Sequence, residues 1–311
     1  MITVLAGGVG AARLLRGVLA VHPAEEVTAI VNTADDVELH GLHVSPDLDT
    51  VTYTLAGAIN PETGWGLVDE TWQAMATLHR YGGITWFNLG DRDLGTHLYR
   101  TQRLSEGAPL SEVTAEIVRG WDLALTVLPV TDDRLRTMVT VDERGDGDVT
   151  EIGFQEYFVQ RRHDVEVRSV RFDGADAAHP GPGVLDALAG AERVVIAPSN
   201  PIVSIGPLLA VPGVRDAVVA RRDDTVAVSP IIAGAALKGP ADRLLRELGH
   251  ESSVVGVARL YRDLAATLVI DDADADLAPA VEAEGMRCVV APTIMSGPDE
   301  AAALGRTVLA A

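Results

Sequence analysis

Short apolar runs alternate with amphipathic segments along most of the chain. The first run, Ile2 to Ala6, leads into Gly7-Gly8-Val9-Gly10 and then into a stretch ending at Leu19 that has the apolar spacing of a helix. The same alternation predicts strands at residues 27–31, 86–89, 123–130, 193–197, 225–229, 267–270 and 287–291, and helices at residues 50–58, 70–80, 110–119, 184–188, 241–248, 278–284 and 298–309. Strands separated by helices favour an α/β fold with a doubly wound, mostly parallel, Rossmann-like sheet.

The pattern changes in the middle of the chain. Thr137 to Val141 is strand-like and runs into the turn-rich stretch Asp142 to Asp148, which predicts a β-hairpin. Together with residues 154–162 and the strand-like residues 165–172, this hairpin predicts a smaller α/β insertion at residues 131–183. The insertion would separate the two parts of the Rossmann-like core, residues 1–130 and 184–311.

Composition excludes several classes of protein. Of the 311 residues, 47% are hydrophobic, which is enough to bury a core, and no apolar stretch reaches the ~18 residues that a membrane span requires. The net charge of -20, without a run of basic residues longer than two, argues against nucleic acid as a partner. A single cysteine and an N-terminus without a basic leader indicate a soluble, cytoplasmic protein.

The first glycine loop suits a phosphate group. In a doubly wound sheet, ligands bind at the carboxyl ends of the strands, and Gly7, Gly8 and Gly10 let the backbone approach a phosphate at the start of a helix. The spacing is not G-x-G-x-x-G, because Arg13 stands where the third glycine would be. Tight packing of the first turn is the alternative explanation.

Four carboxylates follow the second predicted strand, at Asp35, Asp36, Asp47 and Asp49. Oxygen ligands of this kind suit Mg²⁺, which commonly binds through one or two carboxylates and substrate phosphates. We favour Asp36 and Asp49 as ligands of a metal or a substrate. For Asp35 and Asp47 this role and a structural one are equally expected, since aspartates here could also cap turns or the helix predicted from Thr50.

Three later segments also carry candidate chemistry. Asn88 precedes Asp91, Arg92 and Asp93, where the arginine could hold a ligand oxygen or pair with the neighbouring aspartates. His97 follows in the same segment, but His40, which lies between the earlier aspartates, is the better acid-base candidate. Ser199-Asn200-Pro201 follows a predicted buried strand and can present donors to a nucleotide. Lys238, the only lysine, lies ahead of a predicted helix, which favours a phosphate contact.

Several motifs occur in an order typical of one family. They are Val31 to Asp36 (VNTADD), Ser45 to Gly57 (SPDLDTVTYTLAG), Asn88 to Asp93 (NLGDRD), Phe154 to Val159 (FQEYFV), Pro198 to Pro207 (PSNPIVSIGP), and Val228 to Ile231 with Lys238-Gly239-Pro240. On these motifs the chain resembles the 2-phospho-lactate transferase family (CofD/FbiA) of coenzyme F420 biosynthesis, from the glycine loop to at least Tyr261. Departures fall at Val9, Arg13 and Ala34, where the family often has threonine, lysine and glycine.

The resemblance implies a transferase for substituted phosphate groups. It would use Mg²⁺ to move a phosphorylated three-carbon acid from a guanosine diphosphate-linked donor to the deazaflavin Fo, releasing GMP. An arginine-rich, lysine-poor composition looks actinobacterial, so the expected donor is enolpyruvyl-diphosphoguanosine and the expected product is dehydro coenzyme F420-0. A lactyl donor is the alternative. A homodimer is expected as well.

The resemblance also implies roles for the candidate residues. Asp36 and Asp49 would be catalytic and hold Mg²⁺; Asp49, Asn88, Asp91 and Arg92 would contact Fo; and Gly7, Gly8, Gly10, Ser199, Asn200, Pro201 and Lys238 would bind the donor nucleotide.

Two other functions fit the sequence less well. A non-catalytic nucleotide or nucleotide-sugar sensor could use a related fold, but it would need no acceptor pocket. An NAD-dependent dehydrogenase conflicts with the missing third glycine and with Asn32, which stands where a ribose-binding acid would be expected.

Overall fold

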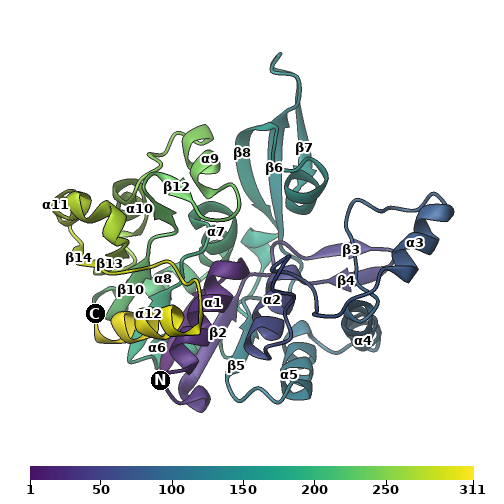
Figure 1. Ribbon diagram of the computed structural model, residues 1–311, viewed down its shortest axis with the longest axis horizontal. Coiled ribbons are helices and arrows are strands. Elements are labelled where there is room, and N and C mark those ends of the chain that lie inside the picture. Colours follow the sequence, from purple (N-terminus) through teal and green to yellow (C-terminus); the bar gives the residue numbers. More distant parts are fainter.

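Parallel strands form the centre of the molecule in the computed structural model, which describes residues 1–311. Seven of them make one sheet in the order β14-β13-β10-β9-β1-β2-β5 (Figure 1). The strands are β1 (Ile2–Ala6), β2 (Val27–Val31), β5 (Thr126–Pro129), β9 (Arg193–Ile196), β10 (Thr225–Val228), β13 (Thr267–Ile270) and β14 (Arg287–Val290). All neighbouring pairs run parallel, so the predicted doubly wound α/β fold is confirmed.

The order of the strands reverses beside β1. From β1 the chain builds outward through β2 to β5, then returns to β9 on the other side of β1 and builds outward again to β14. A switch of this kind leaves a crevice at the carboxyl ends of β1 and β9, because their following loops turn to opposite sides.

Helices cover both faces of this sheet, and others lie beside smaller sheets (Figure 1). The bounds of the helices are α1 (Gly8–Leu19), α2 (Pro46–Leu55), α3 (Gln73–Arg80), α4 (Asp93–Ser105), α5 (Leu110–Gly120), α6 (Val184–Ala189), α7 (Gly206–Ala210), α8 (Val214–Val219), α9 (Ala241–Glu247), α10 (Val254–Tyr261), α11 (Ala278–Ala283) and α12 (Pro298–Ala310). Helices α3, α4 and α9 are among those beside the smaller sheets. None of these helices has the length and apolar character needed to cross a membrane.

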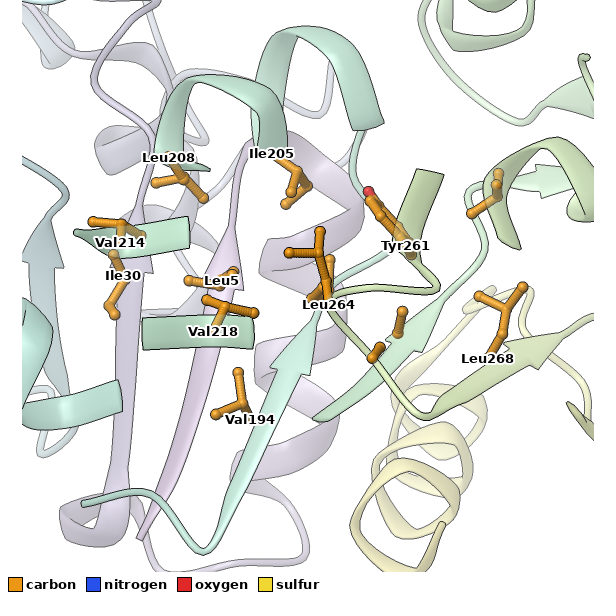
Figure 2. Packing of buried hydrophobic residues seen from close by; sticks show 14 of the residues in the cluster. Leu5, Ile30, Val194, Ile205, Leu208, Val214, Val218, Tyr261, Leu264 and Leu268 are labelled. Atoms are coloured by element: carbon orange, nitrogen blue, oxygen red, sulfur yellow. The ribbon is translucent and has the colours of Figure 1, made fainter. Parts of the chain in front are cut away.

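Alternation along the strands divides the core in two. In β1, Leu5 packs into a cluster of 32 buried residues, whereas Val4 and Ala6 pack into a cluster of 26 on the opposite face. Figure 2 shows the first cluster, in which Leu5, Ile30 and Val194 from the sheet lie near Val214 and Val218 of α8. Strands buried on both faces read as continuous apolar runs, which is why the sequence revealed them.

Three smaller sheets extend from the core. β6 (Arg136–Asp142), β7 (Val149–Gly153) and β8 (Glu166–Asp173) form an antiparallel sheet that projects above the main one in Figure 1. β3 (Val37–Leu39) pairs with β4 (Leu42–Val44), and β11 (Ile231–Ile232) pairs with β12 (Ala235–Ala236). The hairpin predicted at residues 135–149 is confirmed as β6 and β7, and β8 pairs with β6 to complete this three-stranded sheet.

Some local predictions are wrong. Residues 86–89 form no strand, and the loop expected at residues 32–49 contains the β3–β4 hairpin and the start of α2. Because α2 begins at Pro46, Asp49 lies inside the helix and does not precede it.

The first and last helices touch through glycine. A Cβ atom placed on Gly17 of α1 would lie 2.0 Å from the carbonyl oxygen of Ala301 in α12, and one on Gly305 would lie 2.6 Å from the carbonyl oxygen of Gly17. Only residues without side chains permit this approach of two backbones. Helix α12 therefore supports α1, whose N-terminus faces the crevice.

Candidate active site

A cavity of about 580 Å³ occupies the crevice at the carboxyl edge of the sheet. Loops after five core strands line it, together with residues from α2, α4, the segment that follows β7 and the β11–β12 hairpin. The location matches the switch point of the sheet order, where ligands bind in folds of this type. We take this cavity as the candidate active site.

The glycine loop is packed tightly against the loop that follows β9. Ser199 Oγ donates to the carbonyl of Gly7 at 2.8 Å and accepts from its amide at 3.3 Å. A Cβ atom on Gly10 would lie 2.4 Å from the carbonyl oxygen of Pro198, so the backbone must pass here without a side chain. The predicted tight packing is present, and the loop also lines the cavity at the start of α1.

Asn200 shapes the neighbouring turn. Its Oδ1 accepts from the amides of Ile202 and Val203 at 2.9 and 3.3 Å, so it caps the π-helical turn Pro201–Ile205. Asn200 itself lines the cavity, whereas Pro201 is buried behind it.

The opposite wall is held by a carboxylate that lies outside the cavity. Asp271 Oδ2 accepts from the amide and the hydroxyl of Thr293 at 2.8 and 2.9 Å, which fixes the cavity-lining segment Thr293 to Ser296. Arg13 Nη1 donates to the carbonyl of Met295 at 3.4 Å and connects this segment to α1. Sequence reasoning missed the segment because it contains no charged residue.

Asp35 and Asp47 form the floor of the cavity beside the glycine loop. Burial, and then the charge of Asp47, raise the pKa of Asp35 well above its ordinary value. Burial also raises the pKa of Asp47 to about 6, although the side-chain amide of Asn32 donates to its Oδ2 at 3.0 Å. Asp35 Oδ1 is buried without any hydrogen-bond partner. Two dehydrated carboxylates of this kind favour a bound cation.

Asp49 belongs to a different network. Both of its carboxylate oxygens accept from the guanidinium of Arg100, a residue of α4 that is only 1% exposed. Burial raises the pKa of Asp49, and the Arg100 charge acts against that shift. Its negative charge is therefore largely compensated by protein.

The same network continues through His97 to Asp93. Arg100 Nη1 lies 3.3 Å from His97 Nδ1, and because a guanidinium can only donate, the histidine proton is assigned to Nε2, which lies 3.3 Å from Asp93 Oδ2. Tyr53 donates its hydroxyl to Asp93 Oδ1 at 2.6 Å. Although burial acts in the other direction, the neighbouring His97 imidazole and the hydrogen bond from Tyr53 hold the pKa of Asp93 below its usual value.

The two candidate histidines lie in different surroundings. His40 is exposed at the β3–β4 turn and does not line the cavity, whereas His97 is buried and does. Asp93, His97 and Arg100 are spaced by four and three residues on α4, so they share one helix face, and this spacing was the available signal.

Of the predicted site residues, eight line the cavity and four do not. Gly7, Gly8, Gly10, Asp49, Asn88, Ser199, Asn200 and Lys238 line it; Asp36, Asp91, Arg92 and Pro201 lie outside the lining. Asp36 Oδ2 instead accepts from His43 at 2.8 Å and from Ser45 at 2.7 Å.

Asp91, which precedes α4, caps the start of α3, and Glu70, which precedes α3, caps the start of α4. Asp91 accepts from the amides of Gln73 and Ala74 at the start of α3, each at 3.0 Å, and from the hydroxyl of Thr71. Glu70 accepts from the amides of Arg92 and Asp93 at the start of α4, each at 2.8 Å, while the Arg92 guanidinium donates to the carbonyl of Val68. Asp91 and Arg92 thus hold the segments around α3 and α4 in place, and neither side chain lines the cavity.

Substitution Asp91→Ala should loosen the start of α3, since two backbone amides lose their acceptor. We expect faster hydrogen exchange of the Gln73 and Ala74 amides and a lower melting temperature. Exposed Glu62, whose carboxylate makes no hydrogen bond, supplies the matched control Glu62→Ala. Equal exchange at Gln73 and Ala74 in wild type and Asp91→Ala would contradict the capping role.

Comparisons with known proteins agree with this geometry. The family model described as 2-phospho-L-lactate transferase CofD matches residues 2–294. A phosphoenolpyruvate transferase of Streptomyces griseus subsp. griseus is 47% identical over 310 residues, which cover 99% of this chain and 97% of the relative. One from Mycolicibacterium smegmatis is 42% identical over 318 residues, again covering 99% and 97%, and one from Thermobifida fusca is 46% identical over 314 residues, covering 97% and 95%.

A solved structure is similar in fold alone. A UPF0052 family member from Bacillus halodurans superposes with a TM-score of 0.62 at 18% identity, covering 99% of this chain and 98% of that one.

Proposed function

The chain belongs to the 2-phospho-L-lactate transferase CofD family, and on that premise we propose that it transfers a phosphoenolpyruvyl group in coenzyme F420 biosynthesis. The donor would be enolpyruvyl-diphospho-5'-guanosine, the acceptor the deazaflavin Fo, and the products GMP and dehydro coenzyme F420-0. Relatives of 42–47% identity that carry the name phosphoenolpyruvate transferase favour the enolpyruvyl donor over the lactyl one.

One observation carries the proposal: a single cavity joins a phosphate-type loop, unpaired carboxylates and an aromatic region. The glycine loop brings the start of α1, with its free backbone amides, to the cavity, and Asp35 and Asp47 lie beside it. Tyr53, Trp65 and Phe87 line another part of the same cavity. A nucleoside diphosphate and a planar acceptor could therefore be bound together, which transfer between them requires.

The residues present fit Mg²⁺. Hard cations prefer carboxylate oxygen, and the floor of the cavity has two buried carboxylates with raised pKa values and one oxygen without a partner. We propose Asp35 and Asp47 as the residues that hold it, in place of the predicted Asp36 and Asp49. Asp36 lies outside the lining, and Asp49 is already neutralised by Arg100. When bound, Mg²⁺ would neutralise charge on the diphosphate.

The protein groups would act mainly by positioning. Backbone amides at the start of α1 hold the phosphates, and Asn200 and Lys238 supply further donors to the nucleotide. Asn88 would hold the acceptor. Asp93, fixed by Tyr53 and His97, offers a carboxylate to the proton that the acceptor hydroxyl loses as the new phosphorus–oxygen bond forms. Phosphoryl transfer of this kind needs no covalent intermediate on the protein.

Turnover with defined donors tests the proposal. The purified protein should release GMP and form dehydro coenzyme F420-0 when incubated with Fo, MgCl₂ and enolpyruvyl-diphospho-5'-guanosine. Chelation with EDTA should stop the release, and added MgCl₂ should restore it. Turnover only with lactyl-2-diphospho-5'-guanosine would assign the other donor. Tight nucleotide binding without turnover on either donor would leave the sensor function.

We also propose a homodimer. Light scattering on the purified protein should then give twice the chain mass of 32.8 kDa. A mass equal to that of one chain would contradict it.

A further inference from the structure

A turn between α2 and α3 reaches across the cavity to the opposite wall. Thr63 to Gly66 line the cavity, and so does Lys238, which comes from the segment between β12 and α9. A Cβ atom on Gly64 would lie only 2.9 Å from Lys238 Nζ, so the turn rests on the lysine ammonium group. The turn therefore connects two walls of the cavity.

Internal hydrogen bonds fix the shape of the turn. The amide of Asn60 donates to the carbonyl of Gly66 at 3.0 Å, and the amide of Gly64 donates to the carbonyl of Asn60 at 2.9 Å. The hydroxyl of Thr63 donates to the carbonyl of Trp65 at 2.6 Å. Gly64 has a φ angle of +74°, which favours glycine on conformational grounds as well. The turn thus holds the backbone of Trp65 in one position.

Trp65 is the least buried aromatic side chain in the cavity lining. The ring of Trp72 packs edge-on against the Trp65 ring, with the two ring centroids 6.0 Å apart. Trp65 is nevertheless 43% exposed. Other aromatic side chains of the lining are already packed against protein groups. Phe158 stacks on Phe154 and His163, and Tyr53 is 1% exposed with its hydroxyl bonded to Asp93.

We propose that Trp65 is the stacking surface that selects a planar, polycyclic acceptor. The inference rests on the proposed function and assigns it a specificity-determining residue. An indole face supplies a large apolar area at little cost in conformational entropy, and aromatic stacking on a protein side chain strengthens binding without base-specific hydrogen bonds. Because Gly64 rests on Lys238, the turn keeps the indole over the cavity.

Substitutions at Trp65 should change acceptor binding alone. In Trp65→Ala, the Kd for Fo, measured by the fluorescence anisotropy of Fo without donor, should rise by about 10-fold or more. The KM for Fo should rise with it, while the KM for the guanosine donor stays at the wild-type value. Trp65→Phe should restore most of the loss, because it keeps an aromatic face.

A control variant and two different contradicting outcomes separate the stacking role from the proposed transfer. Tyr81→Ala removes another aromatic residue next to α3, one that is 81% exposed and outside the cavity lining, and it should leave both constants unchanged. Wild-type affinity for Fo in Trp65→Ala, or an equal rise of both KM values, would overturn the stacking role. Fo binding by the wild type without GMP release would instead contradict the proposed transfer and leave the stacking role standing.

Discussion

Replacing Asp47 by asparagine should stop catalysis while making the metal-free protein more stable. At pH 7 the wild-type carboxylate is charged, buried and adjacent to Asp35, and a pKa of about 6 in the folded state, against 3.8 unperturbed, means that this charge destabilises the fold. Asp47→Asn should raise the free energy of unfolding by about 1–3 kcal/mol in EDTA. It should lower kcat by at least ~100-fold, because a metal ligand is lost.

The pH dependence of stability provides a second readout. A carboxyl with a raised pKa stabilises the fold when protonated, so this contribution is lost as pH rises from about 4 to above 6. Urea unfolding in EDTA should therefore show a smaller loss of stability over that range in Asp47→Asn than in the wild type.

Magnesium-dependent stabilisation separates the two possible ligand sets. MgCl₂ should raise the melting temperature of the wild type but not of Asp47→Asn. Asp36→Asn is the matched comparison, since it changes an aspartate of the same region that does not line the cavity. If Asp36→Asn lost the magnesium effect and Asp47→Asn kept it, the ligands would be those predicted from the sequence, and our assignment would be wrong.

Substitution Arg100→Met should have the largest effect on folding. The guanidinium is the buried partner of Asp49, and removing it leaves a carboxylate without compensation in the interior. Breaking one half of a buried ion pair costs about 3–5 kcal/mol, which urea unfolding should detect.

A double substitution tests that cause. Asp49→Leu combined with Arg100→Met should recover part of the lost stability, because neither charge then remains buried alone. Arg103→Ala, on the same helix but in a more exposed ion-pair network with Glu106, Glu112 and Glu116, should change stability far less. An additive double variant would mean that Asp49 and Arg100 do not stabilise each other.

The sequence predicted the sheet well because its strands are buried on both faces. Runs such as Ile2–Ala6 and Val27–Val31 contain only buried residues, so they stand out as apolar segments between helices. The family resemblance is confirmed by the family match and by the relatives. Short hairpins such as β3–β4 were missed, since three-residue strands leave too little periodicity to detect.

Side-chain roles were harder to predict than position in the fold. Eight predicted residues do line the cavity, because loops after parallel strands meet at one edge. The sequence does not show which carboxylate forms an ion pair with an arginine. Arg100, which lies in another helix, pairs with Asp49, whereas Asp35 and Asp47 have no basic side chain as a partner. Likewise, the sequence does not reveal that Asp91, a predicted ligand contact, accepts from the first amides of α3.

Contact between the first and last helices affects how the protein is made. Helix α1 begins in the glycine loop and leaves the ribosome early, but its Gly17 packs on Ala301 and Gly305 of α12, which is synthesised almost a whole chain later. The family match ends at residue 294, before α12 begins. The glycine loop is therefore fully supported only after translation has passed α12, and an affinity tag or truncation at that helix would disturb a cavity wall distant in sequence.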